Sequence, residues 1–143
     1  MLVLPGAELE GSLVANGCRV AGRVRNSVLF PGVTVQPGAE IEDSVVMLDV
    51  TIGRGARVRR SILDKFVRVG ERAMVGEGAR SPAPELAWLD GLTLVGKDAT
   101  IPDGASVGPQ VVIGVGAGVE DFAAGPLAPG THLADRRAIQ GLG

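Results

Sequence analysis

The sequence repeats itself every seventeen residues through most of its N-terminal half. Residues 27–43, 44–60 and 61–77 align without gaps, and the shorter segment 12–26 fits the same rows with two residues missing. Beyond residue 92 the spacing shortens to six, with an apolar residue at Val95, Ile101, Val107, Ile113 and Val119. A period of six matches neither the 3.6-residue period of an α-helix nor the strict alternation of one β-strand. The pattern therefore predicts a repeat protein in which each repeat is one structural unit.

These repeats predict a coil with three short, flat faces of six residues each. Three such faces need eighteen residues, so a seventeen-residue coil has one residue fewer at a corner. In each face an apolar and a small residue point inward, while Gly, Pro or a polar residue turns the corner. Successive coils would pair as parallel strands about 4.8 Å apart, which stacks equivalent residues such as Val35, Ile52 and Val69. The predicted fold class is all-β, a single-stranded parallel β-helix of hexapeptide repeats.

Composition agrees with a narrow solenoid. Apolar residues make up 45% of the chain but aromatic residues only 3%, so the core must consist of Val, Ile, Leu and Ala. The chain also contains 22 Gly and 9 Pro. Because Gly and Pro inside a helix cost about 1 and 3 kcal/mol relative to Ala, their recurrence in every repeat excludes a helical bundle.

Charged residues provide an independent check on this register, because their sign alternates from one coil to the next. Opposite charges on adjacent strands contribute about 0.2–1 kcal/mol per pair, whereas like charges destabilise. The predicted columns are Glu8, Arg23, Glu40 and Arg57; Glu10, Arg25, Glu42 and Arg59; Asp43, Arg60 and Glu77; and Arg54 with Glu71.

The repeat is interrupted once and fades at the C-terminal end. We expect residues 1–121 to form the β-helix, with an excursion loop at 80–91 that leaves a corner and folds back. The excursion contains the only tryptophan, Trp88, which is either a clamp on the flank of the solenoid or an apolar patch for a partner. Residues 122–143 are expected to form a cap, because a solenoid exposes its last coil as an edge.

The charge balance and the lack of certain motifs exclude several classes of protein. A net charge of −2 provides no general attraction for nucleic acid or for a membrane surface. The sequence contains no run of 18 apolar residues and no signal peptide at its start, so we expect a soluble, cytoplasmic protein. One cysteine and one histidine cannot supply a metal site, and no cofactor is expected. Cys18 falls in an inward column and is expected to be a small buried residue.

Two stretches carry a family resemblance. The rows RSILDKFVRVGERAMVGEG, at 60–78, and GLTLVGKDATIPDGASVG, at 91–108, resemble the C-terminal domain of ADP-glucose pyrophosphorylase (glucose-1-phosphate adenylyltransferase) or of a closely similar sugar nucleotidyltransferase. The likeness covers roughly residues 11–119. It implies that the β-helix is left-handed, which periodicity alone does not determine.

The resemblance also implies a function. The Gly-rich nucleotide loop and metal-binding acids of the family's nucleotidyltransferase domain have no counterpart in this sequence, so no catalytic residue is assigned. What the resemblance implies for the remaining domain is a non-catalytic module for oligomerisation and regulation in ADP-glucose and glycogen synthesis. Its expected partners are further copies of the chain, a nucleotidyltransferase catalytic domain and a sugar-phosphate or nucleotide effector.

Four residues are candidates for binding such an effector. An effector phosphate favours the forked donors of arginine. Six arginines have a predicted acidic partner in the charge columns, but three near the excursion or in the tail do not. The candidates are Arg80, Arg136, Arg137 and the only histidine, His132.

The alternative is a stand-alone hexapeptide-repeat acyltransferase that uses acyl-CoA. Such enzymes employ a histidine as general base, and His132 would have to fill that role. Its place in the non-repeating tail argues against this, because the base normally projects from the body of the coil. Two weaker motifs also have structural explanations. Residues 114–118 resemble a nucleotide-binding loop, but no helix is expected after them. Asp64 and Lys65 are predicted to turn a corner of the coil.

Overall fold

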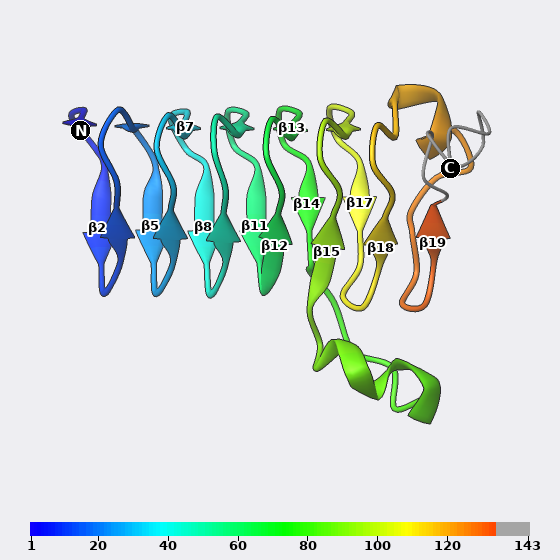
Figure 1. Cartoon of the computed structure of the whole chain (residues 1–143). Helices are drawn as coiled ribbons and strands as arrows, with labels where there is room; N and C mark the ends of the chain where they lie inside the picture. The colour runs from blue at the N-terminus through cyan, green and yellow to red at the C-terminus, as the bar shows by residue number, and fades with distance from the viewer. Residues whose placement is uncertain (134–143) are drawn as a thin grey trace.

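The computed structural model describes residues 1–133 and shows three flat parallel sheets wrapped around one axis (Figure 1). It is a left-handed parallel β-helix of about eight turns, which confirms the predicted fold class. The first sheet contains β1 (Leu2–Val3), β4 (Arg19–Val20), β7 (Thr34–Val35), β10 (Thr51–Ile52), β13 (Arg68–Val69) and β16 (Thr100–Ile101). The second contains β2 (Glu8–Glu10), β5 (Arg23–Arg25), β8 (Glu40–Glu42), β11 (Arg57–Arg59), β14 (Met74–Val75) and β17 (Ser106–Val107). The third contains β3 (Leu13–Val14), β6 (Val28–Leu29), β9 (Val45–Val46), β12 (Ser61–Leu63), β15 (Thr93–Val95), β18 (Val112–Ile113) and β19 (His132–Leu133).

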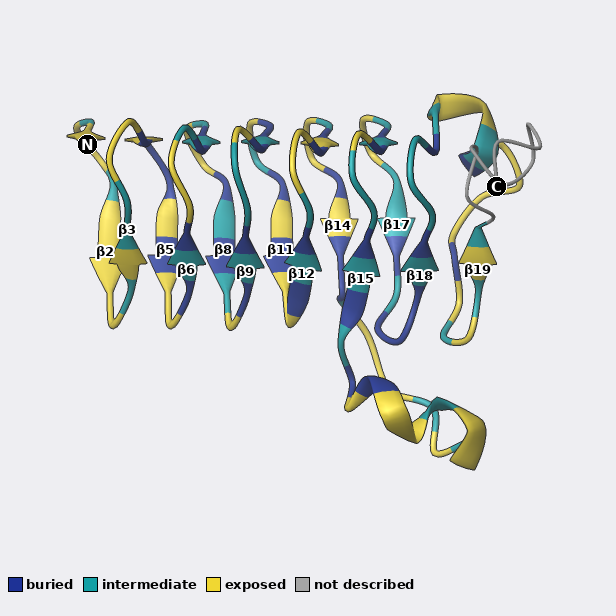
Figure 2. Cartoon of the chain, in the orientation of Figure 1, coloured by how far each residue is buried: buried dark blue, intermediate teal, exposed yellow. Residues whose placement is uncertain are grey.

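The strand register is the one that the repeats predict. Ile52 pairs with Val35 on one side and with Val69 on the other, and all three side chains are buried in the core. Figure 2 shows that buried residues recur at equivalent places in successive coils from β5 onward, between exposed or intermediate neighbours. Cys18 occupies an inward position as expected, and its Sγ lies 3.2 Å from the carbonyl oxygen of Phe30. The core is therefore a stack of small aliphatic side chains, one layer per coil.

A column of serines satisfies buried backbone groups at one corner. Ser27, Ser44 and Ser61 are buried, and each hydroxyl donates to a carbonyl oxygen two residues earlier, at 2.7–2.8 Å. The same hydroxyl oxygens of Ser27 and Ser44 accept the backbone N–H of the serine one coil further on, at 3.1 Å. A small hydroxyl at this corner thus bonds two main-chain groups at once, the N–H of the serine in the next coil and a carbonyl of its own coil.

Replacing Ser44 with alanine is expected to destabilise the domain by about 1–3 kcal/mol, because the Ser61 N–H would lose a buried hydrogen bond and the Glu42 carbonyl would keep only the one from the Arg60 N–H. Urea unfolding of the two proteins, with the slope held in common, measures the difference. Ser12→Ala is the matched control, since the Ser12 hydroxyl bonds at the exposed end of the same column and its loss should cost less. Equal losses for the two variants would contradict this interpretation of the serine column.

Two of the four predicted charge columns form ion pairs along the second sheet. Arginines and glutamates of β2, β5, β8 and β11 alternate, with N–O distances of 3.0–3.8 Å. Their side chains are between a quarter and three quarters exposed, so each pair is worth at most about 1 kcal/mol. The alternation therefore matters more for fixing the register of the coils than for stability.

The other two predicted columns do not form as expected among residues 1–133. Glu77 pairs with Arg59, at 3.2 Å, and not with Arg60, while the nearest cation to Glu71 is Arg72, at 4.0 Å, and not Arg54. Arg60 stands at a corner with a positive φ of 45°. Equivalent side chains on adjacent strands point the same way and lie side by side. Equivalent side chains at corners point in different directions, so equal spacing along the sequence does not bring corner charges together.

An excursion leaves the solenoid between β14 and β15, where Figure 1 shows it projecting below the coils. It contains the 3₁₀ helix η1 (Pro84–Leu89), in which Leu89 is buried while Trp88 is 68% exposed. Leu89, and not Trp88, is therefore the apolar anchor of this segment. The main chain of Ser81 is held by the buried Gln110 amide through two hydrogen bonds, of 2.7 and 3.1 Å. That Trp88 serves as a patch for a partner stays a prediction.

At the C-terminal end, the second 3₁₀ helix, η2 (Val119–Phe122), precedes a segment that returns to the third sheet as β19, where His132 pairs with Val112. The predicted domain boundary at residue 121 stays a prediction. Within residues 1–133 the two 3₁₀ helices are the only helical segments, and neither approaches the length and hydropathy that a membrane span needs.

Candidate functional site

A polar pocket lies where the excursion meets the coils, and we call it the arginine pocket. Its volume is about 250 Å³. Its lining comes from two consecutive coils, from both ends of the excursion and from the corner that follows β17. The lining residues are Arg59, Arg60, Gly76, Glu77, Gly78, Arg80, Gly91 and Pro109.

Local backbone geometry explains why the three arginines meet. Arg59 ends strand β11, and Arg60 turns the corner after it in a left-handed conformation. Arg80 begins the excursion, and its guanidinium packs directly against Gly91, where a Cβ atom would collide with it. Gly91 has a φ of 79° and ends the excursion, so the absence of a side chain there brings Arg80 back to the coils.

The pocket carries an excess of positive charge. Arg59 is already engaged, since its Nε lies 3.4 Å from Glu42 and 3.2 Å from Glu77. Arg60 and Arg80 belong to none of the ion pairs found in the described part of the chain. Three guanidinium groups against the two carboxylates of Glu42 and Glu77 leave a positive charge that attracts anions, and guanidinium forks match phosphate oxygens well.

Size restricts the ligand further. Pockets for drug-sized ligands hold roughly 300–1,000 Å³, so a space of about 250 Å³ suits a smaller molecule. Few groups in the lining are apolar enough to hold a large hydrophobic ligand. The geometry fits a phosphate group with a small polar substituent.

The structure separates the four residues predicted to bind an effector. Arg80 lines the arginine pocket. His132 is exposed on β19 and is not part of that lining, and Arg136 and Arg137 lie outside the described residues. Sequence reasoning missed Arg60, which it assigned to an acidic partner. The signal that could have found Arg60 is the row of equivalent residues before it, Gly11, Asn26 and Asp43, which are residue types that tolerate a left-handed corner, and all three have a positive φ.

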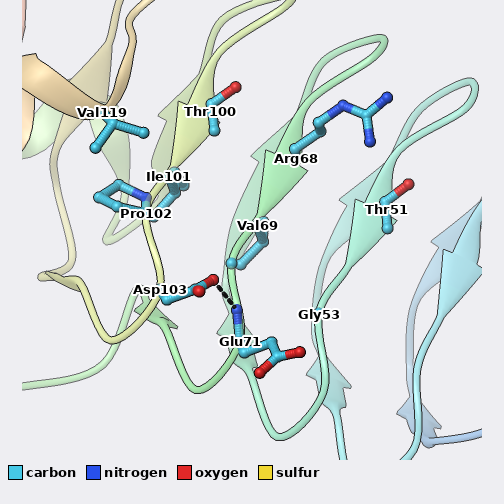
Figure 3. A pocket seen from close by; sticks show the side chains of 11 residues that line it. Thr51, Gly53, Arg68, Val69, Glu71, Thr100, Ile101, Pro102, Asp103 and Val119 are labelled. Atoms are coloured by element: carbon cyan, nitrogen blue, oxygen red, sulfur yellow. Dashed lines mark hydrogen bonds between the residues drawn. The ribbon is translucent and has the colours of Figure 1, made fainter.

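A second hollow of about 420 Å³ lies on the first sheet, across β10, β13 and β16 (Figure 3). It is shallow and largely apolar, and Gly53 and Gly70 are among its lining residues. Its charged lining residues are Arg68, Glu71 and Asp103. Arg68 points away from the two acidic residues (Figure 3), and Asp103 accepts a hydrogen bond of 2.7 Å from the Glu71 backbone N–H. This balance makes the hollow a poorer site for an anion than the arginine pocket.

The remaining motifs behave as structural elements. The Asp64 carboxylate accepts the backbone N–H of Lys65 at 2.7 Å, as expected of a corner. Gly116, within the loop-like segment 114–118, turns a corner with a φ of 76°. Among residues 1–133 no group of three or more His, Cys, Asp or Glu side chains is arranged to hold a metal ion.

Comparison with known proteins agrees with this architecture. The sequence pattern of a family described as GlmU-like, C-terminal hexapeptide matches residues 6–88. The glucose-1-phosphate adenylyltransferase of Acetivibrio thermocellus is 43% identical over 121 residues, which are 82% of this chain and 28% of that protein. The enzyme of the same name from Thermotoga maritima is 45% identical over 137 residues, 92% of this chain and 31% of that protein. The enzyme from Pseudothermotoga lettingae is 40% identical over 131 residues, 90% of this chain and 31% of that protein.

These relatives confirm the resemblance that the seventeen-residue rows indicated. The chain spans less than a third of the length of each of the three. The likeness is thus to one segment of those enzymes, and it covers the β-helix described above.

Proposed function

The chain belongs to the GlmU-like C-terminal hexapeptide family, and from that premise we propose that it is a non-catalytic β-helix module of a glucose-1-phosphate adenylyltransferase-like enzyme. In this role it supports subunit association and carries a site for a phosphorylated effector. Adenylyl transfer itself belongs to a part of the enzyme that this segment does not match.

The interior of the solenoid supports a structural role. Its inward positions are filled by small aliphatic side chains, so no internal space is left for a substrate. Binding must therefore occur on the outside of the coils. The flat faces and the excursion are the surfaces available to another subunit or to a catalytic domain, and further copies of this chain are the first partners to expect.

The proposed effector site is the arginine pocket. The observation that carries it is the convergence of Arg60 and Arg80, two arginines without ion-pair partners in the described chain, beside Arg59. A sugar phosphate or a nucleoside monophosphate has the charge that this group of arginines favours. The sugar or nucleoside part would extend from the pocket toward solvent, because the pocket is too small to enclose it.

Ligand-induced stabilisation tests the effector site. Glucose 1-phosphate, AMP and inorganic phosphate are the probes, with glucose and adenosine as uncharged controls, and the shift in Tm is the measurement. At least one phosphorylated probe should raise the Tm, and the double variant Arg60→Gln, Arg80→Gln should weaken its binding at least tenfold. Arg68→Gln is the matched control, since it removes an exposed arginine outside the pocket. No shift with any probe, or equal binding by the double variant, would refute the site.

Association is tested separately by light scattering after size exclusion. At tens of micromolar, the chain should elute with a mass that is a multiple of its 14.6 kDa. A monomer at that concentration would contradict the association part of the proposal and leave the effector site to be judged by its own test.

A further inference from the structure

The excursion, residues 80–91, projects from the coils in Figure 1 and is joined to them by few contacts. Among the hydrogen bonds of the described chain, only the two between Ser81 and the Gln110 side chain tie it to a coil, at 2.7 and 3.1 Å. Its other hydrogen bonds run within the segment or to the next residue, Leu92. Leu89 is buried but lies outside the cluster of side chains that fills the solenoid. A segment with so few bonds to its surroundings opens at a lower free energy than the coils do.

Both ends of the excursion reach the arginine pocket. Arg80, its first residue, and Gly91, its last, line that pocket together with residues of the coils. The Arg80 guanidinium lies over Gly91, so the contact that closes the base of the excursion also forms part of the pocket wall. Ser81, which the Gln110 amide holds, is the next residue after Arg80. The position of the excursion and the shape of the pocket therefore depend on the same contacts.

Like charges oppose the docked position of the excursion, in which its base lies against the coils. Arg60 belongs to the coils and Arg80 to the excursion, and neither takes part in an ion pair found among residues 1–133. Two positive charges that line one pocket repel each other. An anion between them is attracted to both guanidinium groups, whose forked donors match phosphate oxygens. An anion in the pocket therefore favours docking of the excursion.

We propose that the excursion is a strap whose docking is coupled to ligand binding, a coupling that rests on the effector site proposed above. A phosphorylated ligand holds Arg80, and with it the base of the excursion, against the coils. Coupling is reciprocal, so the ligand binds more tightly when other contacts already hold the excursion docked. Gln110 supplies such a contact. It is a positioning residue, because it holds Ser81 beside Arg80 without lining the pocket itself.

The strap extends the effect of the ligand beyond the pocket. Its 3₁₀ helix carries Trp88, which is 68% exposed. Fixing the base of the excursion restricts where this aromatic side chain lies relative to the coils. A ligand in the arginine pocket thus alters the surface that the domain offers at a second place, which is what a regulatory effector requires.

Hydrogen exchange of the Ser81 amide, followed by NMR, measures docking, because this N–H bonds to Gln110 only while the base of the excursion is in place. Inorganic phosphate and glucose 1-phosphate are the probes. At about 100 times its Kd, a ligand that binds only the docked form slows this exchange by up to about 100-fold, and at least tenfold is expected. The Leu13 amide, which bonds to the Ser27 carbonyl in the first coils, is the control and should exchange at an unchanged rate.

Two variants test the coupling from opposite sides. Arg60→Gln removes one of the two like charges without changing the excursion, so the Ser81 amide should exchange at least twofold more slowly without ligand at low salt, where repulsion is strongest. Gln110→Met removes both hydrogen bonds to Ser81 at similar side-chain length, and the ligand should bind at least fivefold more weakly although every pocket residue is retained. Gly104→Ala is the matched control, since it strains the backbone outside the pocket and should leave ligand affinity unchanged.

The outcomes separate the strap from the effector site. A probe that raises the Tm but leaves Ser81 exchange unchanged would overturn the coupling and leave the site in place, whereas no Tm shift with any phosphorylated probe would overturn both. Unaltered Ser81 exchange in Arg60→Gln would contradict the role of charge repulsion and with it the coupling. Ligand affinity that Gln110→Met retains, or that Gly104→Ala loses equally, would show that affinity does not depend on docking.

Discussion

Replacing Val58 with aspartate is expected to abolish the cooperative unfolding transition of the domain. Val58 is completely buried and stacks between Ile41 and Val75, so an aspartate there would place an ionised carboxylate among aliphatic side chains with no partner. The cost exceeds about 4 kcal/mol, which is most of the stability of a typical small domain. Circular dichroism during heating measures the effect.

Met74→Asp is the matched control for this change. Met74 and Val75 are neighbours in β14, but Met74 points outward and pairs with Arg57 of the adjacent strand. An aspartate at position 74 is therefore solvated and lies next to a positive charge, and its melt should stay cooperative. If the Val58 variant melted as cooperatively as the Met74 variant, the inward assignment of Val58 would be wrong.

Replacing Gly76 with alanine is expected to destabilise the domain by more than about 3 kcal/mol, because two costs add at this position. The backbone there is left-handed, with a φ of 83°. A Cβ atom would also collide with the carbonyl oxygen of Arg59 and come within 2.9 Å of the Ser61 hydroxyl, so two coils would have to separate. The expected loss is measured by urea unfolding, and the arginine pocket, which Gly76 lines, should lose its ligand as well.

Gly104→Ala isolates the first of these costs. Gly104 has a φ of 70°, and a Cβ atom there would meet nothing within 4 Å. Only backbone strain applies, which amounts to about 1–2 kcal/mol. Equal destabilisation by the two substitutions would show that the close approach of coils at Gly76 contributes nothing.

The regular part of the fold was predictable because its rules are local and repeated. One spacing sets the register, so the pairing of Ile52 with Val35 and the burial of Cys18 follow from position in the row. The ion pairs between adjacent strands were predictable for the same reason, because Glu42 and Arg59 are register partners on neighbouring strands.

The candidate site was predictable only in part. Arg80 was identified because it lacked an acidic partner, but its meeting with Arg60 depends on how the excursion returns to the coils. That path is set by single contacts, such as the bonds between Gln110 and Ser81 and the packing of Arg80 on Gly91, which no repeat encodes. The exposure of Trp88 was not predictable either, because Trp88 lies in a 3₁₀ helix of the excursion, and this helix has no equivalent in the other coils.

Because the charges on the second sheet alternate in sign from coil to coil, it matters whether an odd or an even number of coils is added or removed. Deleting the coil that carries β8 would bring β5 beside β11, and arginines would then face arginines. Deleting the two coils that carry β5 and β8 would set the glutamates of β2 beside the arginines of β11, so opposite signs would again be neighbours. Across this region the solenoid can shorten or lengthen without electrostatic conflict only by an even number of coils.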